Sequence, residues 1–417
     1  MKNIKLVFVA LLFCFSSKAQ SKYVTLDSCY ILAHQNFPLV KEHELISKTS
    51  GYSLENISKG LLPQININGQ ASYQSDVTQL PKNIPGVPVL TKDQYKIYAE
   101  VNQPIFDGGI IRAKKNEEKV NELINQQQLE VNLYKLKERV NQLFFGILLI
   151  DEELKESSLM KADIQLGLDK VNAQVNNGIA LRSNADILKA ELLKANQKTI
   201  ELNSNRKALT DMLSMFINKT LDENTVFIKP AEISSTQEIK RPELVLFDYQ
   251  HKKFDVQEDL ISAGNRPKLS FFLQGGFGKP AFNILSNNFD PFYIGGLRLI
   301  FPLSGFYSQG NERELIALGN KNIDVEKEVF LFNTHLSLLQ QNRVIAKFRD
   351  FLKTDDEIIS LRENIKKASL AQLQNGVINS ADYMREVNAQ DEAKQNKILH
   401  QIQLISAEYN QKNITGE

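Results

Sequence analysis

The sequence has little cysteine, with two among 417 residues, and no tryptophan. Cys14 lies inside an N-terminal apolar run, and Phe13 precedes it where a lipoprotein signal carries a small residue, so lipidation is not expected. Removal of that run leaves Cys29 alone, which excludes a disulfide within the chain. Stability must therefore come from packing or from assembly, and the sequence assigns Cys29 no further role.

An excess of charge of either sign is also missing, because 50 Lys and Arg residues stand against 49 Asp and Glu residues. A net charge of +1 offers no broad basic surface, so we expect no nucleic-acid partner. Beyond the N-terminal run, no uninterrupted apolar stretch reaches the roughly 18 residues of a membrane-spanning helix. Any membrane role of the mature chain would require β-strands.

Catalytic and metal-binding patterns are absent as well. The five histidines are scattered at positions 34, 43, 251, 335 and 400, and none forms the His-Glu-x-x-His arrangement that places two ligands on one helix face. The run Gly275-Gly276-Phe277-Gly278 lacks the lysine and the following helix of a phosphate-binding loop. Without an acid–base or nucleophile constellation, we expect no cofactor, no metal and no enzyme activity.

The N-terminus, in contrast, carries a clear pattern. Lys2 and Lys5 precede the apolar run Leu6–Phe15, and Ser17 and Ala19 follow at the spacing of a cleavage site. This arrangement predicts a signal peptide over residues 1–19 and hence an exported protein.

Two spacings of proline and glycine recur in the two halves of the mature chain. A 25-residue spacing between prolines appears twice at an offset of 204, and a 74-residue spacing from proline to glycine appears twice at an offset of 198. The positions are Pro38, Pro63, Pro104 and Gly178 in the first half, and Pro242, Pro267, Pro302 and Gly376 in the second. This repetition predicts two structural repeats, residues 20–218 and 241–417, joined by a linker over 219–240.

Each repeat is expected to contain a helix, two strands, a very long helix, a turn and a final helix. The strands are predicted near residues 64–75, 94–104, 268–277 and 292–303, where apolar and polar side chains alternate with a period of two. Such segments suit a strand that crosses a membrane, although a soluble half-buried sheet gives the same pattern. Four strands cannot close a barrel, so a membrane barrel would need several chains.

The difference of six residues between the two offsets falls between the strands of each repeat, which predicts surface loops there. We expect the connection between Ser75 and Asp93, and the shorter one between Gly278 and Pro291, to face the cell exterior.

Helix-favouring runs without proline extend over residues 107–175 and 308–373. At about 1.5 Å per residue, such a run reaches roughly 100 Å, which predicts a coiled coil or the wall of a tube, either unbroken or in stacked segments. Turns are expected over 176–184 and 374–381, where Asn177-Gly178 and Asn375-Gly376 supply the positive-φ residues that reverse the chain.

The helices after these turns have an apolar heptad pattern in which polar residues occupy some of the positions. In the first repeat the apolar positions predict a packed seam, and Thr199 and Arg206 fill the remaining heptad places. Asp391 and Lys394 interrupt the pattern in the last helix. This interruption is typical either of a wall that faces water or of a simply solvated face.

Two further elements allow a family comparison. The strands end on Gln103-Pro104-Ile105-Phe106-Asp107-Gly108-Gly109 and on Phe301-Pro302-Leu303-Ser304-Gly305, and the second turn reads Gly376-Val377-Ile378-Asn379-Ser380-Ala381-Asp382. With the duplication, strands and long helices, these segments make the chain resemble the TolC family of outer-membrane efflux and export channels.

The resemblance implies an α+β membrane protein that works as a homotrimer in the outer membrane and extends into the periplasm. Each chain would contribute four strands to a 12-stranded β-barrel in outer-membrane lipid, and its long coiled-coil helices would form a periplasmic α-tunnel. The implied function is the exit channel of a tripartite efflux or type I secretion system, with a periplasmic adaptor and an inner-membrane pump as partners. The alternative is a soluble periplasmic coiled-coil adaptor or scaffold protein.

The resemblance also implies a site at the helix turns. Asn177, Gly178, Asn375 and Gly376 would face the adaptor, and Asp382 and Arg385 would lie at the pore entrance. Family members carry two acidic residues at the entrance positions, and Arg385 replaces the second of them. Leu373 and Ile378 stand where members carry an aromatic–arginine gate pair, so other contacts must hold the gate. Neither the cargo nor the class of pump follows from these residues.

Overall fold

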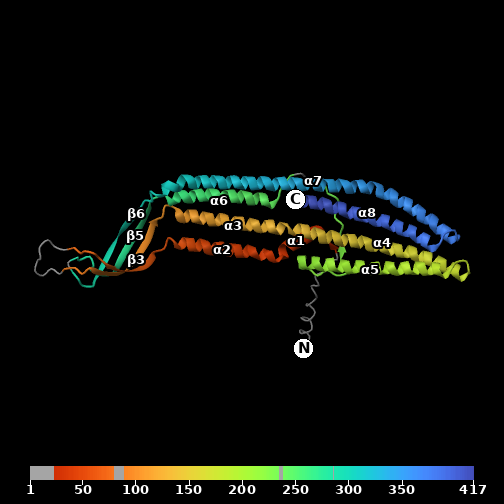
Figure 1. The fold of residues 1–417 in the computed structure, drawn as a ribbon, viewed down its shortest axis with the longest axis horizontal. Coiled ribbons are helices and arrows are strands. Elements are labelled where there is room, and N and C mark those ends of the chain that lie inside the picture. The colour runs from red at the N-terminus through yellow and green to blue at the C-terminus, as the bar shows by residue number, and fades with distance from the viewer. Residues whose placement is uncertain (1–22, 79–88, 234–237, 285) are drawn as a thin grey trace, which may run out of the picture. The chain divides into compact units, whose positions relative to one another are not determined.

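The computed structural model describes residues 23–78, 89–233, 238–284 and 286–417, so the predicted signal peptide lies outside the described residues. The helices are α1 (Leu26–Asn36), α2 (Lys41–Lys59), α3 (Ile110–Tyr134), α4 (Leu136–Asn176), α5 (Arg182–Ile217), α6 (Pro242–Gly264), α7 (Gly305–Gln374) and α8 (Ser380–Thr415). The strands are β1 (Tyr23–Val24), β2 (Gln64–Tyr73), β3 (Asp93–Phe106), β4 (Val226–Phe227), β5 (Lys268–Lys279) and β6 (Asp290–Ile300). Figure 1 shows their order along the chain.

The chain forms two compact units, and each unit takes segments from both halves of the sequence. Among the described residues, the helical unit comprises 23–40, 132–233, 238–241 and 332–417, and the sheet unit comprises 41–78, 89–131, 242–284 and 286–331. The compact units therefore do not coincide with the two predicted repeats. The same order of elements nevertheless recurs in both halves, as α2-β2-β3-α3-α4-α5 and as α6-β5-β6-α7-α8, and the division into repeats stays a prediction.

The sheet unit contains a four-stranded antiparallel sheet in the order β2-β3-β5-β6. Its register aligns Ile67 with Ala99, Ala99 with Gly275, and Gly275 with Tyr293 across the strands. Since neighbouring residues in register point to the same side of a sheet, most apolar residues of the four strands share one face, whereas Phe272, Phe292 and Ile294 lie on the face of Glu100 and Gln274. The alternation predicted from the sequence is confirmed.

Two strand boundaries differ from the predicted ones. β3 continues through Pro104 to Phe106, with a bulge between these residues opposite β5. A bulge is one of the few places in a sheet that tolerate proline, because proline has no N–H to donate to the neighbouring strand. β6 begins at Asp290 and ends at Ile300, ahead of Pro302.

The helical unit is built around α4, which packs against α5 and α8. Its main core combines residues of α1, α4, α5 and α8 with residues of the linker. Cys29 is fully buried in this core, and burial raises the pKa of its thiol to about 12. The thiol is thus a packing group, and it is a free cysteine among the described residues.

The first long helical run is interrupted, whereas α7 is one helix of 70 residues. The interruption lies at Lys135, between α3 and α4. Contacts with the C-terminus flank it, because the Tyr134 hydroxyl donates to the Asn413 carbonyl at 2.8 Å and Lys137 Nζ donates to the Glu417 carbonyl at 3.2 Å. No proline or glycine marks the position, so sequence signals could not locate it.

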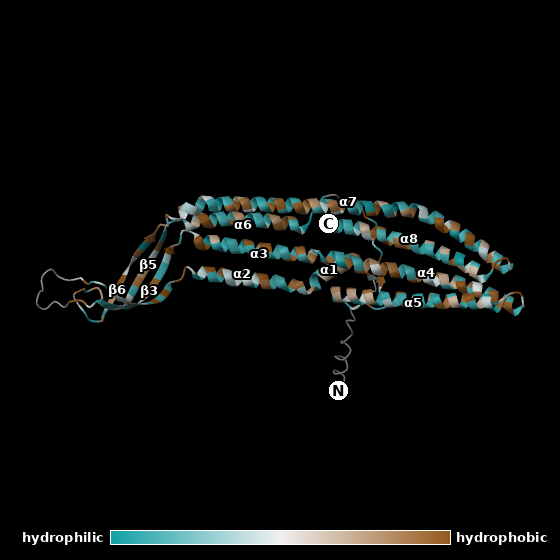
Figure 2. Cartoon of the chain, viewed as in Figure 1, coloured by the Kyte–Doolittle hydropathy of each residue, from teal (hydrophilic) through white to brown (hydrophobic). Residues whose placement is uncertain are grey.

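Apolar and polar residues are interspersed along the helices (Figure 2). Within the described ranges, no helix combines the length and the apolar character needed to cross a membrane.

Candidate functional site

The turns after α4 and α7 have the same local geometry. Gly178 and Gly376 adopt φ values of +71° and +70°, in the left-handed region that only glycine enters without strain. In each turn the N–H of the residue after the glycine donates to a helix carbonyl five residues back, from Ile179 to Gln174 at 2.8 Å and from Val377 to Gln372 at 2.9 Å. This pattern satisfies carbonyls that the helix end leaves free, and the positive φ predicted for both glycines is present.

The remaining turn residues have separate local roles. Asn177 is the C-cap of α4, and the Asn375 side chain donates to the Ala371 carbonyl at 2.9 Å. Asn379 is the N-cap of α8, where its side-chain oxygen accepts from the Asp382 backbone N–H at 2.9 Å. Asp382 therefore lies in the first turn of α8, where a carboxylate interacts favourably with the helix dipole.

Asp382 and Arg385 belong to a group of four charges. Arg385 Nη1 lies 3.4 Å from Asp382 Oδ1, and Arg385 Nε lies 3.3 Å from Glu386 Oε1. Arg362 of α7 also approaches Glu386, at 3.6 Å. Two acids and two bases cancel, so this group (the entrance quartet) has no net charge. Arg385 thus offsets the charge of Asp382, and Arg362 offsets the charge of Glu386.

An apolar core lies directly behind the two turns and fixes the helix ends. Its buried members are Ile164, Leu168, Val171, Ala185, Leu188, Ala195, Leu373, Tyr383, Met384 and Val387. Tyr383 is 1% exposed, and a Cβ added at Gly167 would lie 2.9 Å from its ring, so glycine leaves room for the aromatic side chain. Leu373 is part of this core and Ile378 packs against it, so these residues contribute apolar packing.

Polar contacts also join the two hairpins. Gln174 Nε2 donates to the carbonyls of Gln374, at 2.9 Å, and Leu373, at 3.3 Å. Lys366 of α7 pairs with Asp163 of α4 at 2.6 Å, and the lysine side chain is only 14% exposed. A partly buried ion pair is screened less by solvent than a surface pair. These contacts tie the turn at Gly178 to the turn at Gly376 within one chain.

The charges that interrupt the heptad of α8 do not form a solvated face, which corrects that interpretation. Lys394 pairs with Glu156 of α4 at 2.8 Å, and both side chains are largely buried. Asp391 accepts from Gln395 Nε2 at 2.7 Å through one oxygen, while its other oxygen is buried without a partner. Burial, reinforced by the nearby Glu156, raises the pKa of the Asp391 carboxyl to about 6.

Arg206 also has a role that the heptad pattern did not predict. Its guanidinium pairs with Asp151 at 2.5 Å and donates to the carbonyls of Glu223 at 3.2 Å and Thr225 at 3.0 Å. It thereby anchors the linker, which forms the short parallel pair of β4 with β1. The sequence signal that could have revealed this contact is the presence of an arginine at a heptad position that is otherwise apolar.

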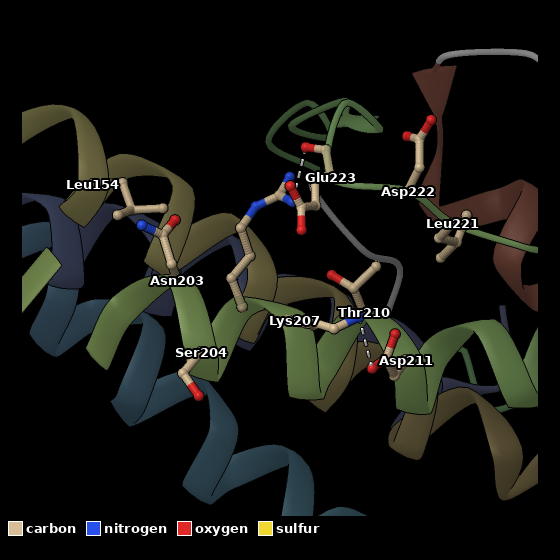
Figure 3. A pocket seen from close by; sticks show the side chains of 10 residues that line it. Leu154, Asn203, Ser204, Lys207, Thr210, Asp211, Leu221, Asp222 and Glu223 are labelled. Carbon is tan, nitrogen blue, oxygen red and sulfur yellow. Dashed lines mark hydrogen bonds and ion pairs between the residues drawn. The ribbon is translucent and has the colours of Figure 1, made fainter. Parts of the chain in front are cut away.

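An open groove of about 810 Å³ lies beside this anchor (Figure 3). Its lining residues are Leu154, Asn203, Ser204, Arg206, Lys207, Thr210, Asp211, Leu221, Asp222 and Glu223. The groove carries both signs of charge and no histidine or cysteine, and Arg206 and Lys207 are held by neighbouring oxygens. Across the described residues, no three or more His, Cys, Asp or Glu side chains gather as a metal site.

Comparison with known proteins reveals likeness at the level of structure. No family model matches the chain, and no curated protein matches its sequence significantly. In contrast, 21 chains of known structure match. One of them is CusC, whose structures concern folding and the formation of a transmembrane channel. It superposes with a TM-score of 0.66 at 11% identity, and the match covers 94% of this chain and 92% of CusC.

Two further structures give a similar match. The outer membrane protein VceC of Vibrio cholerae has a TM-score of 0.65 at 9% identity, covering 94% of this chain and 96% of its own. The MtrE outer membrane channel of Neisseria gonorrhoeae, in its open state, has a TM-score of 0.63 at 12% identity, covering 94% and 88%. At such identities the likeness establishes a shared fold. The TolC-like α+β fold expected from the sequence, with four strands and long helices in each chain, is confirmed.

Proposed function

We propose that three copies of this chain form an exit channel in the outer membrane that extends into the periplasm. The channel would pass cargo from an inner-membrane pump and a periplasmic adaptor to the cell exterior. The observation that carries this proposal is the open four-stranded sheet, in which β2 and β6 have a strand neighbour on one side only. Open sheet edges are not tolerated in lipid, and four strands from each of three copies close a barrel of ordinary size.

The two faces of the sheet support this assignment. The apolar face is strongly exposed, with Ile67 at 79% and Tyr293 at 82%, and removing such a face from water is favourable. On the other face, Glu100 pairs with Arg298 at 3.2 Å and accepts from Gln274 at 3.1 Å. One face thus suits lipid and the other suits an aqueous lumen, and the chain shares its fold with the outer membrane protein VceC and the outer membrane channel MtrE.

The helix turns are proposed to form the periplasmic mouth. Ile179, Leu181 and Val377 are apolar and more than two-thirds exposed at or beside the turns, and exposed apolar residues that cluster in this way are typical of protein contacts. We infer that Asn177, Gly178, Asn375 and Gly376 contact the adaptor. Asp382 and Arg385, one helical turn further along, would line the opening.

The proposal is tested by location and mass. The mature protein is expected in the membrane fraction after cell lysis and high-speed centrifugation, and its mass in mild detergent by light scattering should equal three chains. A protein that stays in the soluble fraction as a monomer would support the soluble adaptor or scaffold instead. The exposed apolar sheet face favours the channel, because a soluble β-domain would cover it.

A further inference from the structure

Aromatic residues that break the strand alternation gather on the polar face of the sheet. Phe292 of β6 lies in register with Gly276 of β5 and Tyr98 of β3, on the same face as Glu100 and Gln274. In the proposed channel this face is the wall of an aqueous lumen. Contact with lipid therefore does not explain why aromatic rings lie there.

These rings surround the ammonium group of Lys96. Lys96 Nζ lies 4.6 Å from the ring centroid of Phe292, 4.8 Å from that of Tyr98 and 5.9 Å from that of Phe282. Phe282 comes from the connection between β5 and β6, and its ring meets the Phe292 ring edge to face at 5.0 Å. A cation at such distances is attracted by the quadrupoles of the rings. Lys96, Tyr98, Phe282 and Phe292 together form what we name the aromatic cage.

A second cation lies over an aromatic ring on this face and serves as a comparison. The Arg298 guanidinium lies 4.6 Å from the centroid of the Phe272 ring, and Glu100 neutralises it at 3.2 Å. Among the described residues, no carboxylate forms an ion pair with Lys96. The positive charge of Lys96 is therefore available to an anion from outside the chain.

Two other carboxylates at this end of the sheet do not neutralise Lys96. Asp93 pairs with Lys279 at 3.5 Å, and both residues lie on the opposite, apolar face. Asp290 accepts from the Ser286 hydroxyl at 2.8 Å. It lies in the same row as Lys96 but two strands away, which is about 10 Å and too far for an ion pair.

Packing alone would explain the rings but not the charge. A Cβ added at Gly276 would lie 2.5 Å from the Cβ of Tyr98, and the rings of Tyr98 and Phe292 lie 6.1 Å apart. Aromatic rings that cover a glycine in this way stabilise a sheet. A neutral side chain at position 96 would serve such packing equally well, whereas an ammonium group without an ion-pair partner adds a preference for anions.

We propose that the aromatic cage binds organic anions that carry an aromatic ring. The anionic group would contact Lys96, and the ring would lie against Phe282, which is 56% exposed. The inference deepens the proposed function, on which the position of the cage in the lumen rests, by naming a class of cargo that the channel wall retains. All four residues belong to the sheet unit of one chain, so binding itself does not require the trimer.

A fluorescence titration tests the cage directly. The chain contains no tryptophan, so Phe282→Trp places a single reporter in the cage. The aromatic carboxylate para-nitrobenzoate, whose nitro group quenches tryptophan, should quench this reporter saturably in detergent-solubilised protein. Adding Lys96→Gln should raise the half-saturation concentration about 10-fold, the lower end expected for losing a hydrogen bond to a charged group.

Two further variants control for charge and position. Lys96→Arg in the Phe282→Trp background keeps the cation and should bind para-nitrobenzoate nearly as well as the parent. Lys279→Gln in that background should leave the titration unchanged, because Lys279 is paired with Asp93 on the opposite face. The neutral para-nitrobenzyl alcohol should bind equally with Lys96 or with Lys96→Gln, which also shows that the cage of the latter variant is folded.

Single-channel recordings separate the cage from the proposed function. Para-nitrobenzoate, but not acetate, should reduce the current of the wild-type protein, and Lys96→Gln should remove this block. Channels that conduct, together with half-saturation concentrations that are equal with and without Lys96→Gln, would overturn the cage alone. Quenching that depends on Lys96 in a protein that forms no channels would instead support the cage and refute the proposed function.

Discussion

The charges of the entrance quartet allow us to predict in which direction each substitution shifts the ion selectivity of the channel. Arg385 lies between Asp382 and Glu386, and Arg362 also contacts Glu386, so the group is neutral in each chain. Arg385→Ala should leave one negative charge per chain, and Asp382→Ala should leave one positive charge. If three copies surround the opening, the two variants should shift selectivity in opposite directions by similar amounts.

The magnitude follows from Coulomb's law with screening. A unit charge about 10 Å from a permeating ion is worth about 0.4 kcal/mol in water. Three such charges would contribute about 1.2 kcal/mol, which screening at about 0.1 M salt reduces to about 0.5 kcal/mol. Cations would be enriched about twofold by Arg385→Ala and anions depleted equally, so the cation-to-anion permeability ratio should rise roughly 4- to 5-fold. Asp382→Ala should lower it by a similar factor.

The assay is the reversal potential of single channels under a salt gradient. Arg385→Lys keeps the charge and is the control, with selectivity close to wild type. At about 1 M salt the Debye length falls to about 3 Å, so the effect should nearly vanish. Neither substitution should unfold the protein, because the Asp382–Arg385 pair is a surface ion pair worth about 1 kcal/mol or less. Unchanged reversal potentials in both variants at low salt would show that these residues do not line the opening.

Three further predictions concern the helical unit. Gly167→Ala should lower the free energy of unfolding, because an overpacking cost of about 1–3 kcal/mol against the buried Tyr383 ring exceeds a helix gain of about 1 kcal/mol. Gly146→Ala is the control, because its new methyl group meets only the rotatable Leu209 methyl, and it should not lower the free energy of unfolding. Equal denaturant midpoints for the two variants would contradict this prediction. The raised pKa of Asp391 means that the folded state holds this proton more tightly than the unfolded state, so stability is lost as the pH rises from about 3.8 through about 6. The Asp391→Asn variant should therefore have a higher melting temperature than wild type above pH 6 and the same melting temperature below pH 3.8. A difference in melting temperature that does not change with pH would refute the raised pKa of Asp391. Arg206→Ala should free the linker and accelerate limited proteolysis over residues 219–225 at least several-fold, whereas Lys207→Ala, which removes an exposed neighbouring pair, should leave the rate unchanged.

The sequence by itself determined the features that depend on local periodicity and steric preference. Alternation with a period of two located all four strands of the sheet, because successive side chains of a strand point to opposite faces. The Asn-Gly pairs located both helix reversals, because glycine enters the left-handed region without a steric penalty. The proline-free run over 308–373 likewise corresponds to the single helix α7.

Only the tertiary structure decided the features that depend on segments far apart in the chain. The break at Lys135 accompanies contacts with the C-terminus, and Arg206 binds the linker carbonyls and Asp151. Lys394 pairs with Glu156 of α4, one oxygen of Asp391 is buried without a partner, and Arg362 of α7 completes the charge balance around Asp382 and Arg385. The same residue type at the same heptad place can be solvated, paired or buried, because its free energy depends on what the fold brings opposite it.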